Sequence, residues 1–289
     1  METKKYEALL LATELGSFSK AADKLGITQS GLTHMMNSLE KEVGFNLLSR
    51  SFNGVQLTPK GEKLLPEIKE LISDARELEN KIAYINETSK KTITMGSYTS
   101  ISVAWVLPII KEFNKEYPEI EVEIRGGTIE QNYQWVKEGA VDLSFASNQY
   151  DKDVDWIHLN NDPLVAVLPP NYNIAAERFD IELFNNNKVL MPSFGFERDI
   201  TRELDKYGVK PIFRPTVVDD EVILKMVEAG LGISILSKLI LTNKSYDVIA
   251  MELNPPIYRE LGIVMKDYNA LRPFEKAFIE YATKYTKKL

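Results

Sequence analysis

The sequence predicts an all-α N-terminal head with a winged helix-turn-helix, a long helix, and a C-terminal α/β domain. Three observations predict this division. Two short amphipathic patterns flank a glycine within residues 17–39, a heptad pattern runs over residues 64–85, and alternating strand and helix patterns follow from residue 92. A chain of 289 residues is long enough for two or three domains with their own cores.

The head begins with two helices separated by a tight turn. Ser17 is a good N-cap for the first, Gly26 is a favourable residue for ending it, and Thr28 is a good N-cap for the second. The apolar positions of the second helix are Leu32, Met35, Met36 and Leu39. Its outward positions are Gln29, Ser30, Thr33, His34 and Asn37. Amides and hydroxyls on such a helix can hydrogen-bond to base edges in the major groove.

A two-stranded wing is predicted after this helix, because Asn53-Gly54 is a strong hairpin signal between two short apolar runs. Arg50 and Lys60 flank the wing and are candidates for phosphate contacts. The full set of candidate DNA-binding residues is Ser17, Thr28, Gln29, Ser30, Thr33, His34, Asn37, Arg50 and Lys60. Helix-turn-helix geometry also occurs in proteins that never touch DNA, so geometry alone leaves both interpretations open.

A long helix is predicted from Thr58-Pro59 to about Glu87, because these two residues are a good N-cap and first helical residue. Apolar residues within it follow a heptad spacing: Leu64, Ile68, Leu71, Ala75, Leu78, Ile82 and Ile85. This spacing predicts a dimerisation seam with a second copy of the chain. The alternative is an amphipathic helix that packs on its own domain.

The charge distribution is uneven. Residues 1–92 carry 13 basic and 13 acidic side chains, so the whole net charge of −7 lies in the remainder of the chain. Because the head is neutral, we expect DNA binding to use local clusters and two heads together.

Several classes of function are disfavoured by composition. The absence of cysteine excludes disulfides, thiolate metal sites and thiol redox sensing. His34 and His158 are the only histidines, so we expect no catalytic residues, no metal site and no cofactor. The sequence contains neither a secretion signal nor an apolar run of membrane-spanning length, which predicts a cytoplasmic protein without membrane contact.

The C-terminal part is predicted to be α/β. Strands are expected near residues 93–96, 120–124 and 141–146, and helices near residues 103–116 and 129–138.

The head motif resembles the N-terminal domain of LysR-type transcriptional regulators. The matching residues are Ser17-Phe18, Ala21-Ala22, Leu25, Thr28-Gln29, Leu39-Glu40, Arg50, Leu57-Thr58 and Gly61. Three later segments also resemble that family: Leu107-Pro108 with Phe113, Tyr117-Pro118 and Val122; Gly139 with Asp142-Leu143; and Val227 to Ile233. Asn53 stands where a second basic residue is common in the family, so one phosphate contact is expected to be lost.

The resemblance implies a DNA-binding domain (1–58), a linker and dimerisation helix (59–88) and an effector-binding domain (92–289). Like a periplasmic binding protein, the last would have two lobes, the first covering about 92–161 and 269–289 and the second about 162–268, with a crossover near residues 162–170. Ligands in such domains bind near the carboxyl ends of strands, between the lobes. Candidate effector-binding residues there are Ser97, Tyr98, Thr99, Ser100, Thr128, Ser147, Asn148, Ser193, Phe194 and Asp219. Each Ser, Thr or Asp could instead simply cap a helix.

The sequence therefore predicts a regulator that binds double-stranded DNA at an imperfect inverted repeat and responds to a small-molecule effector. A carboxylate is one candidate effector, although Asp219-Asp220-Glu221 would favour a cationic or zwitterionic one. The expected assembly is a dimer or a tetramer, and RNA polymerase is a further candidate partner. The alternative function is a cytoplasmic small-molecule-binding protein of solute-binding fold without DNA-regulatory activity.

Overall fold

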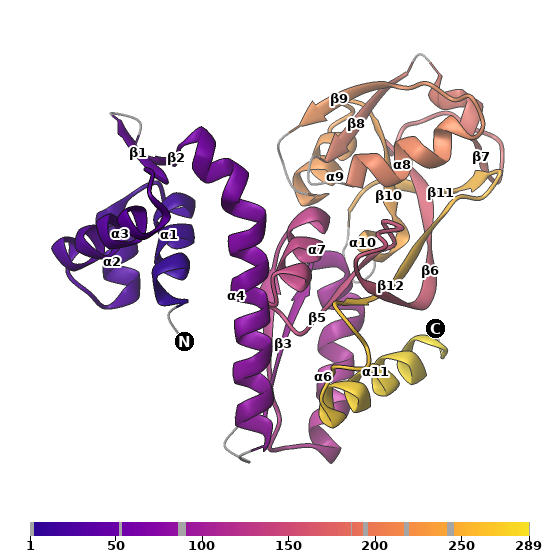
Figure 1. Cartoon of the computed structure of the whole chain (residues 1–289). Helices are drawn as coiled ribbons and strands as arrows, with labels where there is room; N and C mark the ends of the chain where they lie inside the picture. The colour runs from indigo at the N-terminus through magenta and orange to yellow at the C-terminus, as the bar shows by residue number, and fades with distance from the viewer. Residues whose placement is uncertain are drawn as a thin grey trace. The chain divides into compact units, whose positions relative to one another are not determined.

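The computed structural model describes residues 3–51, 54–85, 91–185, 187–192, 196–216, 220–241 and 246–288. The chain divides into two compact units, residues 1–90 and residues 91–289, drawn in Figure 1 from indigo through to yellow. The first unit has its own hydrophobic core, and the second unit has separate cores for two lobes.

The first unit begins with the helix-turn-helix and the wing (Figure 1). Its elements are α1 (Lys4–Glu14), α2 (Phe18–Leu25), α3 (Gln29–Val43), β1 (Leu48–Ser51) and β2 (Gly54–Leu57). The predicted caps are confirmed: the Ser17 hydroxyl accepts the Lys20 N–H at 3.4 Å and the Thr28 hydroxyl accepts the Gly31 N–H at 3.0 Å. Gly26 ends α2 in the left-handed conformation, with φ of 66°.

Gly54 explains how the wing packs on the helix-turn-helix. Its φ is +100°, and a Cβ atom there would lie 2.5 Å from the Gly16 carbonyl oxygen. The adjacent Val55 N–H donates to that same oxygen at 3.0 Å. Only glycine allows this close approach, which ties the wing to the turn that precedes α2. Asn53 lies outside the described residues.

Helix α4 (Pro59–Ile85) completes the first unit. The Thr58 hydroxyl accepts the Gly61 N–H at 3.0 Å and donates to the Asn46 carbonyl at 2.7 Å, so the start of α4 is anchored to the loop between α3 and β1. A Cβ atom at Gly61 would lie 2.4 Å from the Leu47 carbonyl oxygen, which requires glycine at this crossing.

The second unit is built on a sheet with the strand order β4-β3-β5-β12-β6-β10-β8-β9, in which β11 pairs with β6 and β7 pairs with β11. The strands are β3 (Thr92–Ser97), β4 (Glu121–Gly126), β5 (Leu143–Ser147), β6 (Asp155–Leu168), β7 (Phe179–Asp180), β8 (Lys188–Pro192), β9 (Ile212–Thr216), β10 (Ile233–Ser237), β11 (Ile249–Asn254) and β12 (Tyr258–Met265). The helices are α5 (Thr99–Ile101), the π-helix η1 (Ser102–Val106), α6 (Leu107–Glu116), α7 (Ile129–Lys137), the 3-10 helix η2 (Ile181–Phe184), α8 (Phe196–Asp205), α9 (Asp220–Glu228), α10 (Lys238–Leu241) and α11 (Pro273–Thr286).

The first lobe has hydrophobic layers on both faces of its strands. Phe145 and Ile263 pack in the layer that contains residues of α6 and α11. The neighbouring Ala146 and Val264 pack in the layer that contains residues of α7. Successive strand residues point to opposite faces, so these short strands support helices on both sides. The second lobe encloses a third core, which includes residues of β8, β10, α8 and α9.

Strand β6 crosses from one lobe to the other without interruption. Its first part pairs with β12, and residues 164–168 pair with β10 and β11. The expected crossover at residues 162–170 therefore belongs to a longer strand that begins at Asp155. The expected return to the first lobe near residue 269 is wrong, because β12 pairs with β5 from residue 261 onward. Hydrogen bonding between strands, which local sequence does not reveal, sets the return earlier.

Candidate DNA-binding head and effector site

Helix α3 presents a polar surface. Gln29, Ser30, His34 and Asn37 are exposed, and Thr33 is partly exposed. On the opposite face Leu32, Met36 and Leu39 are buried in the head core. The amphipathic pattern thus separates packing residues from a row of amide, hydroxyl and imidazole groups. These groups are free of helix packing and have the chemistry needed to contact base edges.

The other candidate DNA-binding residues play more local roles in this structure. Ser17 and Thr28 are helix caps, and the hydroxyls of Thr28 and Ser30 are 3.1 Å apart. The Lys60 ammonium lies 5.3 Å from the centre of the Phe45 ring. Arg50 is in β1, opposite Val55, but its side chain lies outside the described residues.

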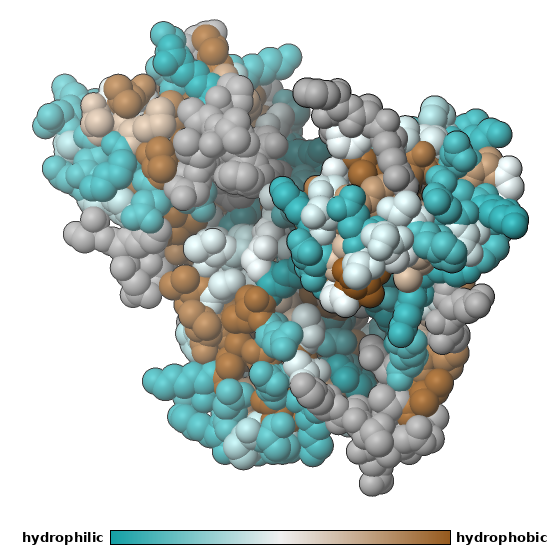
Figure 2. All heavy atoms as spheres, turned by 90° about the vertical axis from the view of Figure 1, so that its left-hand side faces the viewer, coloured by the Kyte–Doolittle hydropathy of each residue, from teal (hydrophilic) through white to brown (hydrophobic). Residues whose placement is uncertain are grey.

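The predicted seam of α4 divides between two faces of the helix. Ile68 and the off-register Ile72 are buried in the head core, and Leu64 packs against that core. Ala75 is also buried. Leu71, Leu78 and Ile82 retain 46%, 47% and 48% of their surface in this single chain. Figure 2 shows exposed hydrophobic side chains, in brown, on the face that it presents.

Both interpretations of α4 therefore apply, each to part of the helix. Packing on its own domain accounts for Ile68, which is buried in the head core, and in part for Leu64; their place in a seam with a second copy stays a prediction. The side chain of Ile85 lies outside the described residues. Of the predicted seam residues whose side chains the structure describes, Leu71, Leu78 and Ile82 form an exposed apolar row, which we call the α4 stripe.

The candidate effector residues of the first lobe separate into caps and non-caps. Thr128 caps α7 in a capping box with Gln131, with hydrogen bonds of 2.9 and 3.2 Å. Thr99 and Ser100 begin α5 with no side-chain cap, and Thr99 is exposed. Ser97 is fully buried, and its hydroxyl donates to the Tyr98 carbonyl at 3.3 Å. The capping alternative thus accounts for Thr128 and leaves Thr99 and Ser100 without such a role.

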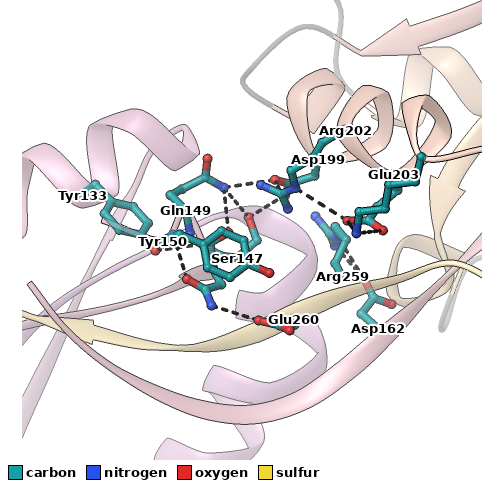
Figure 3. A network of polar contacts seen from close by, with 12 residues as sticks. Tyr133, Ser147, Gln149, Tyr150, Asp162, Asp199, Arg202, Glu203, Arg259 and Glu260 are labelled. Atoms are coloured by element: carbon teal, nitrogen blue, oxygen red, sulfur yellow. Dashed lines mark hydrogen bonds and ion pairs between the residues drawn. The ribbon is translucent and has the colours of Figure 1, made fainter. Parts of the chain in front are cut away.

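Ser147 connects the two lobes (Figure 3). Its hydroxyl donates to Asp199 Oδ2 of α8 at 2.6 Å. The Gln149 amide donates to Asp199 Oδ1 at 3.0 Å, and the Arg202 guanidinium lies 3.4 Å from the same oxygen. Asp199 is 1% exposed, and groups from both lobes satisfy its carboxylate, as a buried polar group requires. Asn148 instead donates to Glu260 Oε2 at 2.9 Å.

Two further contacts join the lobes at their surface. Arg198 of α8 forms an ion pair with Glu130 of α7 at 3.4 Å. The Arg202 guanidinium lies 5.3 Å from the centre of the exposed Tyr150 ring. Both are solvent-exposed contacts, so the buried Asp199 cluster contributes more to the relation between the lobes.

A second buried cluster joins the strands that connect the lobes. Asp162 of β6 and Arg259 of β12 are opposite each other in register, and the Arg259 Nε and Nη2 atoms donate to Asp162 Oδ2 at 3.1 and 2.7 Å. The Ser237 hydroxyl donates to the same oxygen at 2.5 Å. Burial by itself would lower the pKa of Arg259, but the neighbouring Tyr98 and Asp162 outweigh it and raise this pKa.

Sequence reasoning missed the most buried polar residues of this region. Asp162, Asp199 and Arg259 were not among the candidates, although a charged residue within an apolar pattern signals a buried partner. Among these three residues, Asp162 carried this sequence signal, because an apolar run follows it directly. Ser193, Phe194 and Asp219, which were candidates, lie outside the described residues.

A winged helix-turn-helix with an exposed polar helix face, in one chain with a two-lobed α/β domain, defines a DNA-binding regulator with a ligand-binding domain. Family models support this class along almost the whole chain. Residues 3–62 match the model described as bacterial regulatory helix-turn-helix protein, lysR family, and residues 86–287 match the LysR substrate binding domain. The chain belongs to the LysR family of transcriptional regulators.

Individual proteins show the same relationship. The Bacillus subtilis (strain 168) protein YvbU, described as an uncharacterized HTH-type transcriptional regulator, is 26% identical over 93% of each chain. Full-length CbnR, solved in complex with its target DNA, matches with a TM-score of 0.66 at 16% sequence identity. The match covers 98% of this chain and 99% of the CbnR chain. The regulatory domain of Synechocystis PCC6803 CcmR in complex with 2-PG has a TM-score of 0.62 at 20% identity, covering 68% of this chain and 98% of that one.

Among the described residues, no helix combines the length and the apolar character needed to cross a bilayer.

Proposed function

We propose that this LysR-family regulator binds an imperfect inverted repeat in double-stranded DNA with the α3 helices of two heads. The observation that carries the proposal is the polar row of the exposed Gln29 and Asn37 with the partly exposed Thr33, on a helix whose other face is packed in the head core. Base edges in the major groove present donors and acceptors that match amide and hydroxyl groups. The CbnR–DNA complex, a structure of similar fold, supports a DNA target.

Two copies of the chain would pair through the α4 stripe. Leu71, Leu78 and Ile82 are spaced by seven and four residues, so they lie along one side of α4. Burying this row against a second copy would remove apolar surface from water. A two-fold pair of heads then reads two half-sites, which is why the operator should be an inverted repeat.

A small molecule would bind between the lobes of the second unit and change the relation between the two heads. The lobes are joined by the contacts of Ser147 and Gln149 with Asp199, and a ligand that binds between the lobes would compete with these contacts. Its binding free energy would therefore depend on the arrangement of the lobes, as ligand control requires. The CcmR complex with 2-PG supports a ligand in this type of domain.

RNA polymerase is a further proposed partner, and the proposed location is the cytoplasm. No catalytic activity is part of the proposal. These elements rest on the role of the family as transcriptional regulators.

The proposal is tested by a gel shift with DNA from beside the gene and with a scrambled fragment of equal length. We expect a selective shift for wild type. Gln29→Ala should reduce discrimination between the two fragments by about tenfold, because one good side-chain contact to a base contributes about 1–3 kcal/mol. The matched control is Gln134→Ala, an exposed glutamine of α7 in the other unit, which should leave discrimination unchanged.

Two results would contradict the proposal. Equal losses on both fragments for Gln29→Ala would reject base contact by that residue. A wild-type protein that binds neither fragment selectively at moderate salt would favour the alternative, a small-molecule-binding protein without regulatory activity.

A further inference from the structure

The two lobes of the second unit have separate apolar cores. Among the described residues, the buried members of the second-lobe cluster lie within residues 164–257, and those of the first-lobe clusters lie within residues 93–159 and 261–282. The partly buried Leu239 of α10 is an apolar contact across this division. Parts of a chain that are not joined by a large apolar interface are expected to move relative to each other, so polar contacts decide how the lobes are held.

Helix α8 of the second lobe supplies three such polar contacts. Arg198, Asp199 and Arg202 each contact the first lobe. The side chains of Arg198 and Arg202 are 70% and 39% exposed, whereas that of Asp199 is buried. Contacts of exposed charges are screened by water, while a buried charge depends on its partners. Asp199 therefore contributes most to holding α8 against the first lobe.

The first lobe holds its side of this contact in a fixed form. The Tyr133 hydroxyl donates to the Ser147 carbonyl and accepts the Gln149 N–H, both at 3.0 Å. Tyr150 has a φ of 54°, a left-handed conformation that costs free energy for a residue with a Cβ atom. Asn148 Oδ1 accepts the Tyr150 N–H at 2.9 Å, which stabilises this conformation. Contacts within the first lobe therefore preorganise the segment that receives α8.

The donors that this segment offers to Asp199 can be exchanged for water (Figure 3). The Ser147 hydroxyl and the Gln149 amide are neutral, and they donate at 2.6 and 3.0 Å. The charged group beside Asp199 is Arg202, which belongs to the same helix. If α8 moves away, Asp199 keeps Arg202 and gains water in place of the two neutral donors. Separation thus leaves no buried charge without a partner, as a reversible contact requires.

We propose that Ser147, Gln149 and Asp199 form a latch that holds the lobes in one arrangement and opens without unfolding of either lobe. The proposal rests on the proposed function, because it assigns ligand control to an equilibrium between a latched and an open arrangement. A ligand that separates the lobes must break the latch, and its differential affinity for the two arrangements has to exceed the strength of these contacts.

The test measures the distance between the lobes in the full-length protein. The chain contains no cysteine, so spin labels can be attached specifically to the double variant Gln134→Cys/Asp205→Cys, at exposed positions of α7 and α8. An excess of unlabelled protein restricts the measurement to distances within one chain. Continuous-wave and pulsed electron paramagnetic resonance together cover short and long distances, so separation of the lobes gives a second distance population.

Ser147→Ala is the latch variant, and Ser234→Ala is its matched control. Both hydroxyls are buried and donate one hydrogen bond, at 2.6 Å to Asp199 and at 2.7 Å to the Leu190 carbonyl within the second lobe. Ser147→Ala should raise the ratio of separated to latched molecules about tenfold or more, because a hydrogen bond to a charged group contributes that much. Ser234→Ala should lower the melting temperature and leave the distances unchanged. If Ser147→Ala shows no melting transition, Gln149→Ala decides in its place.

The outcomes separate this inference from the proposed function. An unchanged distance distribution in the latch variant overturns the latch, and so does an equal change in Ser234→Ala, which would indicate general loosening. A separated population that appears only with loss of circular dichroism overturns it as well, because a lobe would then unfold. A gel shift on the same preparations tests DNA selectivity: if wild type is selective while Ser147→Ala leaves the distances unchanged, only the inference fails.

Discussion

Breaking the buried ion pair between Asp162 and Arg259 should destabilise the second unit strongly. Arg259→Met keeps a long side chain but leaves the Asp162 carboxylate, 1% exposed, without its charged partner. Removing one member of a buried pair costs about 3–5 kcal/mol, because the other charge remains buried. A unit of this size loses about 2–4 °C of melting temperature per kcal/mol, so we expect a decrease of about 10 °C.

The assay is thermal unfolding of the full chain by circular dichroism, with Asp162→Leu/Arg259→Met as the matched double variant. The double variant removes both charges and should recover most of the lost melting temperature, because replacing a buried pair by apolar residues is often close to neutral. A single variant that melts within about 2 °C of wild type would refute the reasoning, since less than about 1 kcal/mol would then be lost. A double variant as unstable as the single one would also refute it.

Three further predictions concern other parts of the molecule. Leu78→Lys places a charge in the α4 stripe and should halve the mass measured by light scattering, whereas an unchanged mass would reject pairing through this stripe. Gly54→Ala should destabilise the head by about 2 kcal/mol or more, since its Cβ meets the Gly16 carbonyl at positive φ; Gly126→Ala, with open space and ordinary φ, is the control. Burial and Glu275 raise the pKa of Asp142 to about 6, from an ordinary value of 3.8. The folded state thus holds the proton more tightly, and stability should fall as pH rises from about 4 to about 6. In thermal melts between about pH 4 and about pH 6, Asp142→Asn should therefore lose less melting temperature than wild type as pH rises. An equal loss in both proteins would contradict this assignment to Asp142.

The head was largely predictable because its signals are local. Ser17, Gly26 and Thr28 cap or end helices within a few residues of themselves, and the apolar spacing of α3 identifies its packed face. Backbone hydrogen bonding and side-chain periodicity act over one or two turns, so the sequence contains the information directly.

The seam of α4 was only partly predictable, because periodicity identifies apolar positions without identifying what covers them. Ile68 and Leu71 are three residues apart in one heptad pattern, yet the first is buried by the head and the second is exposed. The off-register Ile72 joins the head core as well. Which face meets which partner depends on how α4 crosses the head, and this follows from the close approach at Gly61.

The site between the lobes was the least predictable part. Ser147 and Asp199 are 52 residues apart and Asp162 and Arg259 are 97 apart, so no local pattern links either pair. Strand pairing between β6 and β12 brings the second pair into register, and the approach of α8 to β5 brings the first together.

By itself, the sequence determined the helix-turn-helix, its polar face, the long helix and the α/β character of the second unit, because caps, turns and periodicity act between near neighbours. Only the tertiary structure decided which apolar residues of α4 remain exposed, where the chain returns to the first lobe, and which charges meet between the lobes. These features depend on contacts between segments far apart in the chain. The free energy of burying a charge or an apolar side chain is defined only once its distant partner is in place.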